Sequence, residues 1–251
     1  METNGARVET VLQLVRTRTS ASIADIAAEC RVSEMTIRRD LHKLAQAGQV
    51  IRVPGGARIA RSFGAEKSFL ERLQKMADAK QRIGRAAAEL VADGGSVSLD
   101  SGTTTLCIAR QLRERRNIVV FTFSLAVLEE LAGAESVRVE LTGGTYRPSS
   151  HDLVGNAVNE GLSGVSADVV FIGAAALSFR KGAMVNDPEA QRALLDSGRR
   201  RVLVVDSSKI GTEALYGLCR VEKCELVITD AGIRRADLVR LRRITSVLVA
   251  E

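Results

Sequence analysis

The 251-residue sequence contains no tryptophan, only two histidines and three prolines, and 3% aromatic residues. Four cysteines are present, but their spacings match no zinc site, so we expect no metal centre. No run approaches the roughly 18 apolar residues of a membrane span, and residues 1–7 lack the apolar core of a signal peptide. We therefore expect a cytoplasmic protein with no membrane partner. The cysteines, which should stay reduced and pack as small buried hydrophobic residues, are Cys30, Cys107, Cys219 and Cys224.

The charge of the chain is positive but only moderately so, with a formal net charge of +6 and an isoelectric point near 9.4. Residues 1–60 hold nine Lys or Arg and six Asp or Glu, so basic residues are denser in the first quarter. Hydrophobic residues make up 45% and charged residues 26%, as in an ordinary soluble globular protein. The length suggests one or two domains. The charge is compatible with a nucleic-acid partner but does not by itself indicate one.

The residues between Ser33 and Gly48 predict an amphipathic helix with one basic face. Ser33 suits the N-cap, and Gly48 suits the C-terminal end because glycine tolerates positive φ. The apolar stripe consists of Ile37, Leu41 and Leu44. The opposite face carries Met35, Arg39, His42 and Gln46, and Arg38 and Lys43 flank it. A solvated charged helix in some other small domain would show the same pattern.

The segments around this helix favour a helix-turn-helix with a wing. A first helix carries Val8, Val11, Leu12 and Val15, and a short helix after Ser22 turns Ile23, Ile26 and Ala27 inward. The following turn and the longer helix complete the motif, whose second helix enters the DNA major groove. Two short strands over 49–53 and 57–59, joined at Pro54-Gly55-Gly56, form the wing. Candidate DNA contacts are Ser33, Met35, Thr36, Arg38, Arg39, His42, Lys43, Arg52 and Arg58; His42 is equally an exposed residue with no partner.

Beyond residue 60 the pattern predicts an α/β domain. Apolar strands are expected over 96–99, 118–122, 137–141, 167–172, 202–205, 225–229 and 245–249. Helices are expected over 80–91, 103–113, 125–131, 154–162 and 189–197. Such alternation predicts a mostly parallel sheet covered on both faces. We divide the chain into a DNA-binding domain over 1–60, an ordered connector over 61–79, and an α/β domain over 80–251.

Polar residues follow several of these strands, at the sheet edge where α/β proteins bind ligands. The first strand runs into Asp100-Ser101-Gly102-Thr103-Thr104-Thr105, which combines a glycine turn, hydroxyl groups and a helix start that can hold a phosphate. Another strand leads to Arg147, which could clamp an anion with two bonds, and another to Lys209, a counter-charge for phosphate. Each is also compatible with a structural role. The threonines could cap a helix, Arg147 could be a surface arginine after a turn, and Lys209 could lie in a solvated loop. His151 lies in a polar loop, where we expect a solvated side chain.

Several motifs resemble those of the DeoR family of bacterial regulators. In the first 60 residues they are Val32-Ser33-Glu34, Thr36-Ile37-Arg38-Arg39-Asp40-Leu41, Gly48, Arg52 and Gly55-Gly56-Ala57. Only Pro54 departs there, where the family usually has His or another side chain. Further along they are Leu99-Asp100-Ser101-Gly102-Thr103-Thr104, Gly143-Gly144, Gly155, Phe171-Ile172-Gly173, Asp206-Ser207-Ser208-Lys209 and Ile228-Thr229-Asp230. The resemblance covers nearly the whole chain.

The resemblance implies an effector domain related to sugar-phosphate isomerases such as ribose-5-phosphate isomerase, binding a phosphorylated sugar or related metabolite. The effector-binding residues it indicates, together with the strand ends, are Asp100, Ser101, Gly102, Thr103, Thr104, Thr122, Gly143, Gly144, Arg147, Asp187 and Lys209. The sequence departs from the family at Phe123, where Asn is usual, and at Ala175-Ala176, where Asp-Gly is common. It departs again at Asp187, where Glu is usual, and at Gln191, where Lys or Asn is common. These departures leave open a less polar ligand, a differently shaped ligand or no ligand at all.

We interpret the protein as a transcriptional regulator, in the family's usual manner a repressor released by its ligand. It would bind double-stranded operator DNA as a homo-oligomer, dimer or tetramer, because two-fold operators mirror two-fold proteins. We assign no catalytic residues, cofactor or metal. One alternative is a sugar-phosphate isomerase with an appended DNA-binding module, for which Asp100, Asp187 or Glu189 could serve as base. Another is a constitutive DNA-binding protein whose α/β domain only oligomerises.

Overall fold

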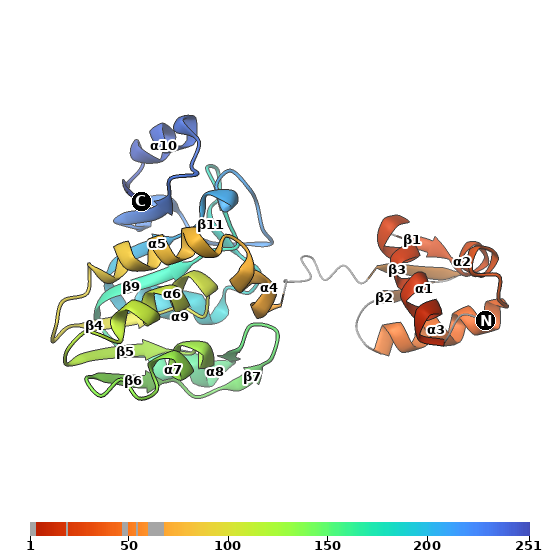
Figure 1. Ribbon diagram of the computed structural model, residues 1–251, viewed down its shortest axis with the longest axis horizontal. Helices are drawn as coiled ribbons and strands as arrows, with labels where there is room; N and C mark the ends of the chain where they lie inside the picture. Colours follow the sequence, from red (N-terminus) through yellow and green to blue (C-terminus); the bar gives the residue numbers. More distant parts are fainter. Residues whose placement is uncertain (1–3, 19, 47–49, 54, 60–67) are drawn as a thin grey trace. The chain divides into compact units, whose positions relative to one another are not determined.

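The computed structural model describes residues 4–18, 20–46, 50–53, 55–59 and 68–251 (Figure 1). The chain forms two compact units, Met1–Ala65 and Glu66–Glu251, each with a hydrophobic core of its own. Within the described ranges, no helix is both long and apolar enough to cross a bilayer.

The first unit is a three-helix domain with a small antiparallel sheet. Its elements are α1 (Asn4–Arg18), β1 (Ser20–Ser22), α2 (Ile23–Cys30), α3 (Glu34–Gln46), β2 (Val50–Val53) and β3 (Gly56–Ile59). The strands lie in the order β1-β3-β2, so β2 and β3 form the wing. Strand β1 was not predicted, because Ser20–Ser22 is too short and too polar to show an alternating pattern. Gly48 and Pro54, singled out above, lie outside the described residues.

Local capping and burial explain why these residues form a helix-turn-helix. The Ser22 hydroxyl accepts from the Asp25 N–H at 3.0 Å, and the Ser33 hydroxyl accepts from the Thr36 N–H at 3.2 Å. Arg31 adopts a left-handed conformation with φ 52°, which ends α2 in the way a C-terminal cap requires. The predicted apolar stripes of the three helices meet in one core, formed by Val11, Leu12, Val15, Ile26, Ala27, Ile37, Leu41, Leu44, Val50 and Ala57.

The second unit has a seven-stranded sheet in which every pairing is parallel. Its strands are β4 (Ser96–Leu99), β5 (Ile118–Thr122), β6 (Val137–Leu141), β9 (Ala167–Gly173), β12 (Gly198–Val204), β14 (Leu226–Asp230) and β15 (Ser246–Ala250), in the order β15-β14-β12-β9-β4-β5-β6. The chain runs outward from β4 to β6 and then returns to β9 on the other side of β4. The boundary between β4 and β9 is therefore the switch point at which α/β sheets bind ligands.

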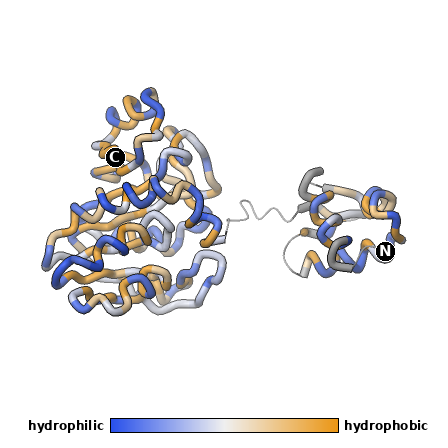
Figure 2. The backbone as a smooth tube through the Cα atoms, in the orientation of Figure 1, coloured by the Kyte–Doolittle hydropathy of each residue, from blue (hydrophilic) through white to orange (hydrophobic). Residues whose placement is uncertain are grey.

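Helices cover both faces of this sheet, as its strands require. The helices are α4 (Phe69–Gln74), α5 (Ala77–Ala88), α6 (Thr103–Leu112), α7 (Leu125–Leu131), α8 (Asn156–Leu162), α9 (Glu189–Asp196) and α10 (Arg235–Arg242). In β9, Val169 and Phe171 join the core that contains residues of α5, α6 and α7, while Val170 and Ile172 join the core that contains residues of α8, α9 and α10. Residues on both faces of β9 are thus buried, and hydrophobic stretches run through the sheet in Figure 2.

The smaller additions to this sheet were not predicted. They are the hairpin of β7 (Thr145–Arg147) and β8 (Asp152–Val154), and a second sheet of β10 (Ala176–Ser178), β11 (Gly182–Val185) and β13 (Tyr216–Cys219). Two short 3-10 helices, η1 (Ser207–Lys209) and η2 (Val221–Lys223), follow β12 and β13. The helix expected over 154–162 begins only at Asn156, because Val154 pairs with Thr145 in the hairpin. Of the expected connector, α4 and the start of α5 belong to the second unit.

Close packing of α5 on α6 gives a test of this arrangement. A Cβ at Gly84 would lie 2.6 Å from the Cys107 carbonyl carbon and oxygen, so we expect Gly84→Ala to destabilise the second unit by about 1–3 kcal/mol, the usual cost of overpacking. Gly217→Ala is the matched control, because its Cβ would meet nothing nearer than the Lys181 carbonyl at 3.9 Å. Urea unfolding of both variants measures the effect; equal midpoints would contradict the packing.

Candidate functional site

The exposed face of α3 is the candidate DNA interface. Arg39, His42 and Lys43 are exposed, and Met35 is 58% exposed. Arg38 pairs with Glu34 at 3.1 Å, with both side chains about half exposed. A surface pair of this kind contributes little to stability and can exchange for a phosphate contact. The structure therefore places these predicted contacts on one solvent-facing surface.

Two other predicted contacts on this helix have local roles. The Ser33 and Thr36 hydroxyls are 2.9 Å apart, and Ser33 also caps α3. They shape the N-terminal end of the helix that faces DNA in this motif. On the wing, Arg52 is exposed in β2. Arg58 belongs to β3, but its side chain lies outside the described part of the structure.

A buried ion pair holds α3 in position. The Asp40 carboxylate is 2% exposed and accepts from the Arg7 Nε of α1 at 2.8 Å and from its Nη2 at 3.4 Å. Removing either partner of such a pair would leave an uncompensated charge. Sequence reasoning did not single out Asp40 for this role, although a carboxylate between the inward Ile37 and Leu41 is a visible signal.

In the second unit, Asp100 marks the switch point of the sheet. It follows β4 and is 1% exposed. Its carboxylate accepts from the Ser101 N–H at 2.7 Å, the Gly173 N–H at the end of β9 at 2.9 Å, and the Gln191 Nε2 of α9 at 2.6 Å. Burial raises the pKa of Asp100 to about 6, and the hydrogen bonds from Gln191, Gly173 and Ser101 oppose this rise. Asp100 therefore joins two strands and a helix at one point.

The loop after Asp100 leads into α6 as predicted. Gly102 is the N-cap and has no side chain to occupy the first N–H groups of the helix, which leaves them suited to an anion. The hydroxyl of Thr105 donates to the Asp100 and Gly102 carbonyls at 2.6 and 2.7 Å. Thr103 and Thr104, the two predicted contacts in the first turn, are buried at 4% and 2% exposure.

A chain of charged side chains extends from this loop. The Ser101 hydroxyl donates to Asp152 Oδ2 at 2.7 Å, and Asp152 is fully buried. Arg147 donates to both oxygens of Asp152, at 3.0 and 2.8 Å, and to Asp187 Oδ2 at 2.6 Å. We expected Arg147 to clamp an anion, but its guanidinium already binds two carboxylates. Asp152 was not predicted; its only signal was its place in the polar loop before Val154.

The remaining predicted residues near this edge support the backbone. The Thr122 hydroxyl donates to the Leu99 carbonyl at 2.8 Å and accepts from the Ser124 N–H at 3.1 Å. Gly144 has φ 142°, and a Cβ there would lie 2.9 Å from the Val154 carbonyl oxygen; a Cβ at Gly143 would lie 3.3 Å from Ala157. The Thr122 hydroxyl therefore links the ends of β5 and β4. The two glycines allow the β7–β8 hairpin and Ala157 to pack closely against the backbone.

Two lysines with few carboxylate neighbours lie at the same end of the second unit. Lys209 Nζ donates to the Ala174 carbonyl at 2.7 Å and lies 3.9 Å from Asp206 Oδ2. Lys80 of α5 is 3% exposed, and its Nζ donates to the carbonyls of Arg72 and Lys75. Burial, and then the positive charge of Lys209, lowers the pKa of Lys80 to about 8; burial likewise lowers the pKa of Lys209. Lys80 was missed, although a lysine three residues before the inward Ile83 is a readable signal.

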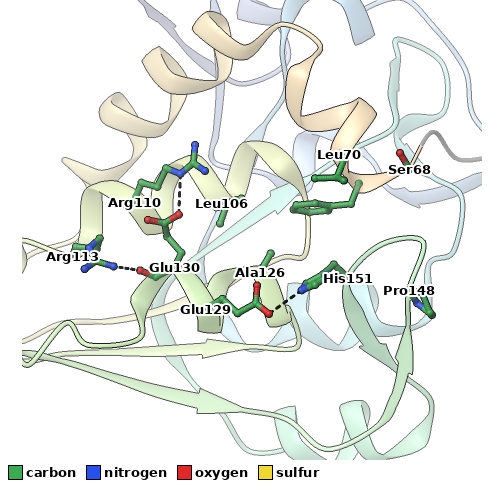
Figure 3. A pocket seen from close by; sticks show the side chains of 11 residues that line it. Ser68, Leu70, Leu106, Arg110, Arg113, Ala126, Glu129, Glu130, Pro148 and His151 are labelled. Carbon is green, nitrogen blue, oxygen red and sulfur yellow. Dashed lines mark hydrogen bonds and ion pairs between the residues drawn. The ribbon is translucent and has the colours of Figure 1, made fainter.

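A separate pocket of about 560 Å³ lies between α4, α6, α7 and the β7–β8 turn (Figure 3). Apart from apolar residues such as Leu106, its wall carries paired charges: Arg110 with Glu130 at 3.0 Å, and His151 with Glu129 at 3.1 Å. None of the predicted effector-binding residues lines it. His151, expected to be solvated, has a side chain that is 32% exposed, and its ring contacts Phe69 and Tyr146. Its backbone has a φ of 57°.

Two of the four cysteines are buried, and so is Phe123 among the departures from the family pattern, whereas Asp187 is exposed. The four cysteines are free; Cys107 and Cys224 are buried, whereas Cys30 and Cys219 are only partly so. Phe123 is 1% exposed and packs in the core formed with α8, α9 and α10. The structure describes no group of three or more His, Cys, Asp and Glu side chains suited to a metal ion within the ranges given above.

Comparison with known proteins agrees with both units. Residues 7–63 match the DeoR-like helix-turn-helix domain, and residues 75–231 match the DeoR C terminal sensor domain. The chain belongs to the DeoR family. The family resemblance, the winged helix-turn-helix followed by an α/β domain, and the interpretation as a DNA-binding transcriptional regulator are thereby confirmed.

Individual relatives cover almost all of this DeoR-family chain. A putative aga operon transcriptional repressor of Escherichia coli O157:H7 is 32% identical over 252 residues, covering 98% of this chain and 94% of its own. The glycerol-3-phosphate regulon repressor of Escherichia coli strain K12 is 28% identical over 225 residues, covering 88% of each. Among solved structures, ribose 5-phosphate isomerase A of Methanocaldococcus jannaschii has a TM-score of 0.41 at 17% identity, covering 54% of this chain and 55% of that chain.

The buried Lys80 predicts a pH dependence of stability. Its pKa is about 8 in the folded chain and 10.5 ordinarily, so between these values the unfolded chain binds more protons and stability rises with pH. Lys80→Met removes this contribution. We expect the unfolding free energy of the wild type, relative to the variant, to increase from about pH 8 to about 10.5 and to stay level below that range. Urea unfolding across the window measures it; parallel profiles would contradict a buried, desolvated Lys80.

Proposed function

We propose that this DeoR-family protein is a repressor whose sensor domain binds a phosphorylated polyol or sugar, and that binding releases the operator. The observation that carries the proposal is the meeting of Lys209, the uncapped start of α6 and the buried Asp100 at the switch point of a parallel sheet. The names of two relatives, a glycerol-3-phosphate regulon repressor and an aga operon repressor, support it.

The charges of the site support a ligand with two chemically different ends. Lys209 and the first N–H groups of α6 favour an anionic group, because both present positive charge or donors. Arg147 is bound by Asp152 and Asp187, so that side carries one positive and two negative charges. Carboxylates accept hydrogen bonds from hydroxyl groups. A phosphate at the lysine end and hydroxyls at the exposed Asp187 carboxylate satisfy both sides.

The first unit supplies the DNA contacts in this proposal. Exposed α3 would enter the major groove, where an arginine can pair with guanine O6 and N7, and Arg52 on the wing would meet a phosphate. We propose that the first unit is the DNA-binding domain and that the second unit, which includes α4 and the whole of α5, is the sensor and oligomerisation domain. A dimer or tetramer would present two α3 helices to a two-fold operator.

Arg39 and Arg52 should affect DNA binding differently. Arg39→Ala is expected to cost about 1–3 kcal/mol on the specific operator and to relax discrimination at one base pair. Arg52→Ala should weaken specific and unrelated DNA alike and reduce the salt slope by about one unit. Binding titrations on operator and scrambled DNA at several salt concentrations distinguish the two. Unchanged operator affinity in Arg39→Ala would show that α3 does not read bases through this residue.

Lys209 should decide the response to effector. Lys209→Ala is expected to weaken binding of a phosphate ester by about 1.5–3 kcal/mol, the contribution of a charge-assisted bond, and to move the operator-release curve at least tenfold for each 1.4 kcal/mol lost. Operator affinity without ligand should change little. Lys223→Ala is the matched control, because it removes the same charge from an exposed position on η2. A Lys209→Ala curve lying on the wild-type curve would remove Lys209 from the site.

We propose no catalytic role for this domain. Asp100, the most plausible base, has its carboxylate occupied by two N–H groups and the Gln191 amide, which stabilise it in place rather than leave it aimed at a substrate proton. Aldose–ketose exchange by the purified protein, assayed with phosphorylated pentoses and hexoses, tests this directly. Turnover that disappears in Asp100→Asn would favour the isomerase alternative.

A further inference from the structure

Two cysteines of the second unit lie side by side. Cys219 is the last residue of β13, and Cys224 directly follows the 3-10 helix η2. Their sulfur atoms are 3.8 Å apart, within hydrogen-bond contact for sulfur. In a disulfide the two sulfurs are about 2.05 Å apart. The side chains therefore already point at each other, and a bond requires only a short approach of the two sulfurs.

The backbone holds the two cysteines with different firmness. The Cys224 N–H donates to the Val221 carbonyl at 2.9 Å, and the Cys224 carbonyl accepts from the Thr245 hydroxyl at 2.6 Å. Cys219 pairs with Ala183 of β11, but the register of the two strands shifts next to this pair. We therefore expect Cys219 to make most of the movement that bond formation requires.

One cysteine is partly accessible to solvent, and the other belongs to the core. Cys224 is 2% exposed and lies in the hydrophobic core formed with α8, α9 and α10, whereas Cys219 is partly exposed and packs against that core. The adjacent Arg220 and Lys223 are exposed. A small polar oxidant arriving from solvent therefore reaches Cys219 before Cys224.

The surroundings of Cys219 favour its thiolate. The hydrogen bond from the Cys224 thiol lowers the pKa of Cys219, burial opposes this shift, and the positive charges of Lys223 and Arg201 add to it. The same hydrogen bond, and then burial, raises the pKa of Cys224. Because the thiolate is the nucleophilic form of cysteine, Cys219 is suited to react first and Cys224 to react second.

We propose that Cys219 and Cys224 form a thiol-oxidation site, in which Cys219 reacts with a hydroperoxide such as hydrogen peroxide and Cys224 then closes a reversible disulfide. This site goes beyond the proposed function and does not depend on it. Both thiols are free in the structure, which is the reduced state of such a pair. Transient disulfides of this kind are the ones that sense redox changes in reducing compartments.

The reaction with hydrogen peroxide has two steps. The Cys219 thiolate attacks one peroxide oxygen, the O–O bond breaks, and hydroxide leaves and takes up the proton that the thiol lost, so that Cys219 becomes a sulfenic acid. The Cys224 sulfur then attacks the Cys219 sulfur while its own proton passes to the departing oxygen, so that the S–S bond forms, the S–O bond breaks and water leaves. Two thiols lose two electrons, and one peroxide becomes two waters. A dithiol reductant reverses the bond by exchange.

The disulfide would tie two sheets together. Cys224 lies directly before β14 of the seven-stranded sheet, whereas β13 belongs to the three-stranded sheet of β10, β11 and β13. The partner strand β11 ends at Val185, shortly before Asp187 of the proposed effector site. A short strand with exposed residues opens locally at low free energy, so a covalent bond at its end should restrict that opening.

Peptide mapping of the full-length wild type tests the bond. The protein is treated with equimolar hydrogen peroxide, its remaining thiols are blocked, and it is digested with trypsin. Trypsin cuts after Arg220 and Lys223, so Cys219 and Cys224 fall in separate peptides that only a disulfide joins. We expect these peptides to be linked and to separate in dithiothreitol. Unlinked peptides with blocked thiols, or Cys219 linked to any other cysteine, would overturn the proposal.

Two variants separate the roles of the sulfurs. Cys224→Ser should leave Cys219 as a sulfenic acid that dimedone traps, and Cys219→Ser should leave Cys224 reduced. Cys107 is the control within each protein, because it is buried and burial raises its pKa; it should react at least about tenfold more slowly than Cys219. Trapping at Cys224 in Cys219→Ser, or equal rates at Cys107 and Cys219, would contradict the assigned roles. The wild-type map decides the proposal if either variant fails to fold.

Hydrogen exchange measures the effect of the bond on β13. In the oxidised wild type, amides over 216–219 should exchange about tenfold more slowly than in the reduced protein. Cys219→Ser given the same peroxide treatment is the matched control and should keep the rates that it has before treatment. Equal rates over 216–219 in reduced protein and in protein shown to carry the disulfide would overturn the restriction of β13.

Discussion

The contact between the Asp100 carboxylate and the Gly173 N–H joins the two halves of the sensor sheet, and the rest of the site is arranged around it. Strand β4 begins one half and β9 begins the other, so their carboxyl ends meet only here. Burying an ionised carboxylate is unfavourable unless several donors satisfy it, and three donors from three elements do so. Because the buried Asp100 carboxylate needs these donors, the α6 loop must lie close to the end of β9 and to α9.

A similar constraint organises the DNA-binding unit. Asp40 lies on the inner side of α3, and its bond to Arg7 fixes the angle between α1 and α3. Because the inner side of α3 is occupied by Asp40 and the apolar stripe, Arg39 and Lys43 are left on the outside. The basic face is thus a consequence of how the other face is buried, which explains why helix periodicity alone located it.

Sequence reasoning was most successful where a local pattern determines the structure. All seven strands of the parallel sheet were predicted. Some, such as β9 and β14, are buried on both faces and contain short apolar runs, whereas the edge strand β6 alternates apolar and charged residues. The α6 loop was placed because the Gly102 turn and the threonines are adjacent in sequence. It missed β1, the β7–β8 hairpin and the β10–β11–β13 sheet, whose strands of three or four residues are too short to show periodicity. Lys80 and Asp152 were missed because their partners, backbone carbonyls and Arg147, become neighbours only on folding.

The hydrogen bonds of Arg147 show how one departure from the family pattern, Asp187, changes the charge of the proposed site. Asp187 lies close enough to accept from Arg147 at 2.6 Å, so the guanidinium is shared by two carboxylates. Phe123 places a ring in the core formed with α8, α9 and α10, and its carbonyl accepts from the Leu153 N–H at 2.9 Å. The β7–β8 hairpin is therefore held by charge and backbone bonds, with its carboxylate oxygens as the polar groups on that side. In the proposed effector site the cation that remains is Lys209, whose Nζ donates to the Ala174 carbonyl at 2.7 Å.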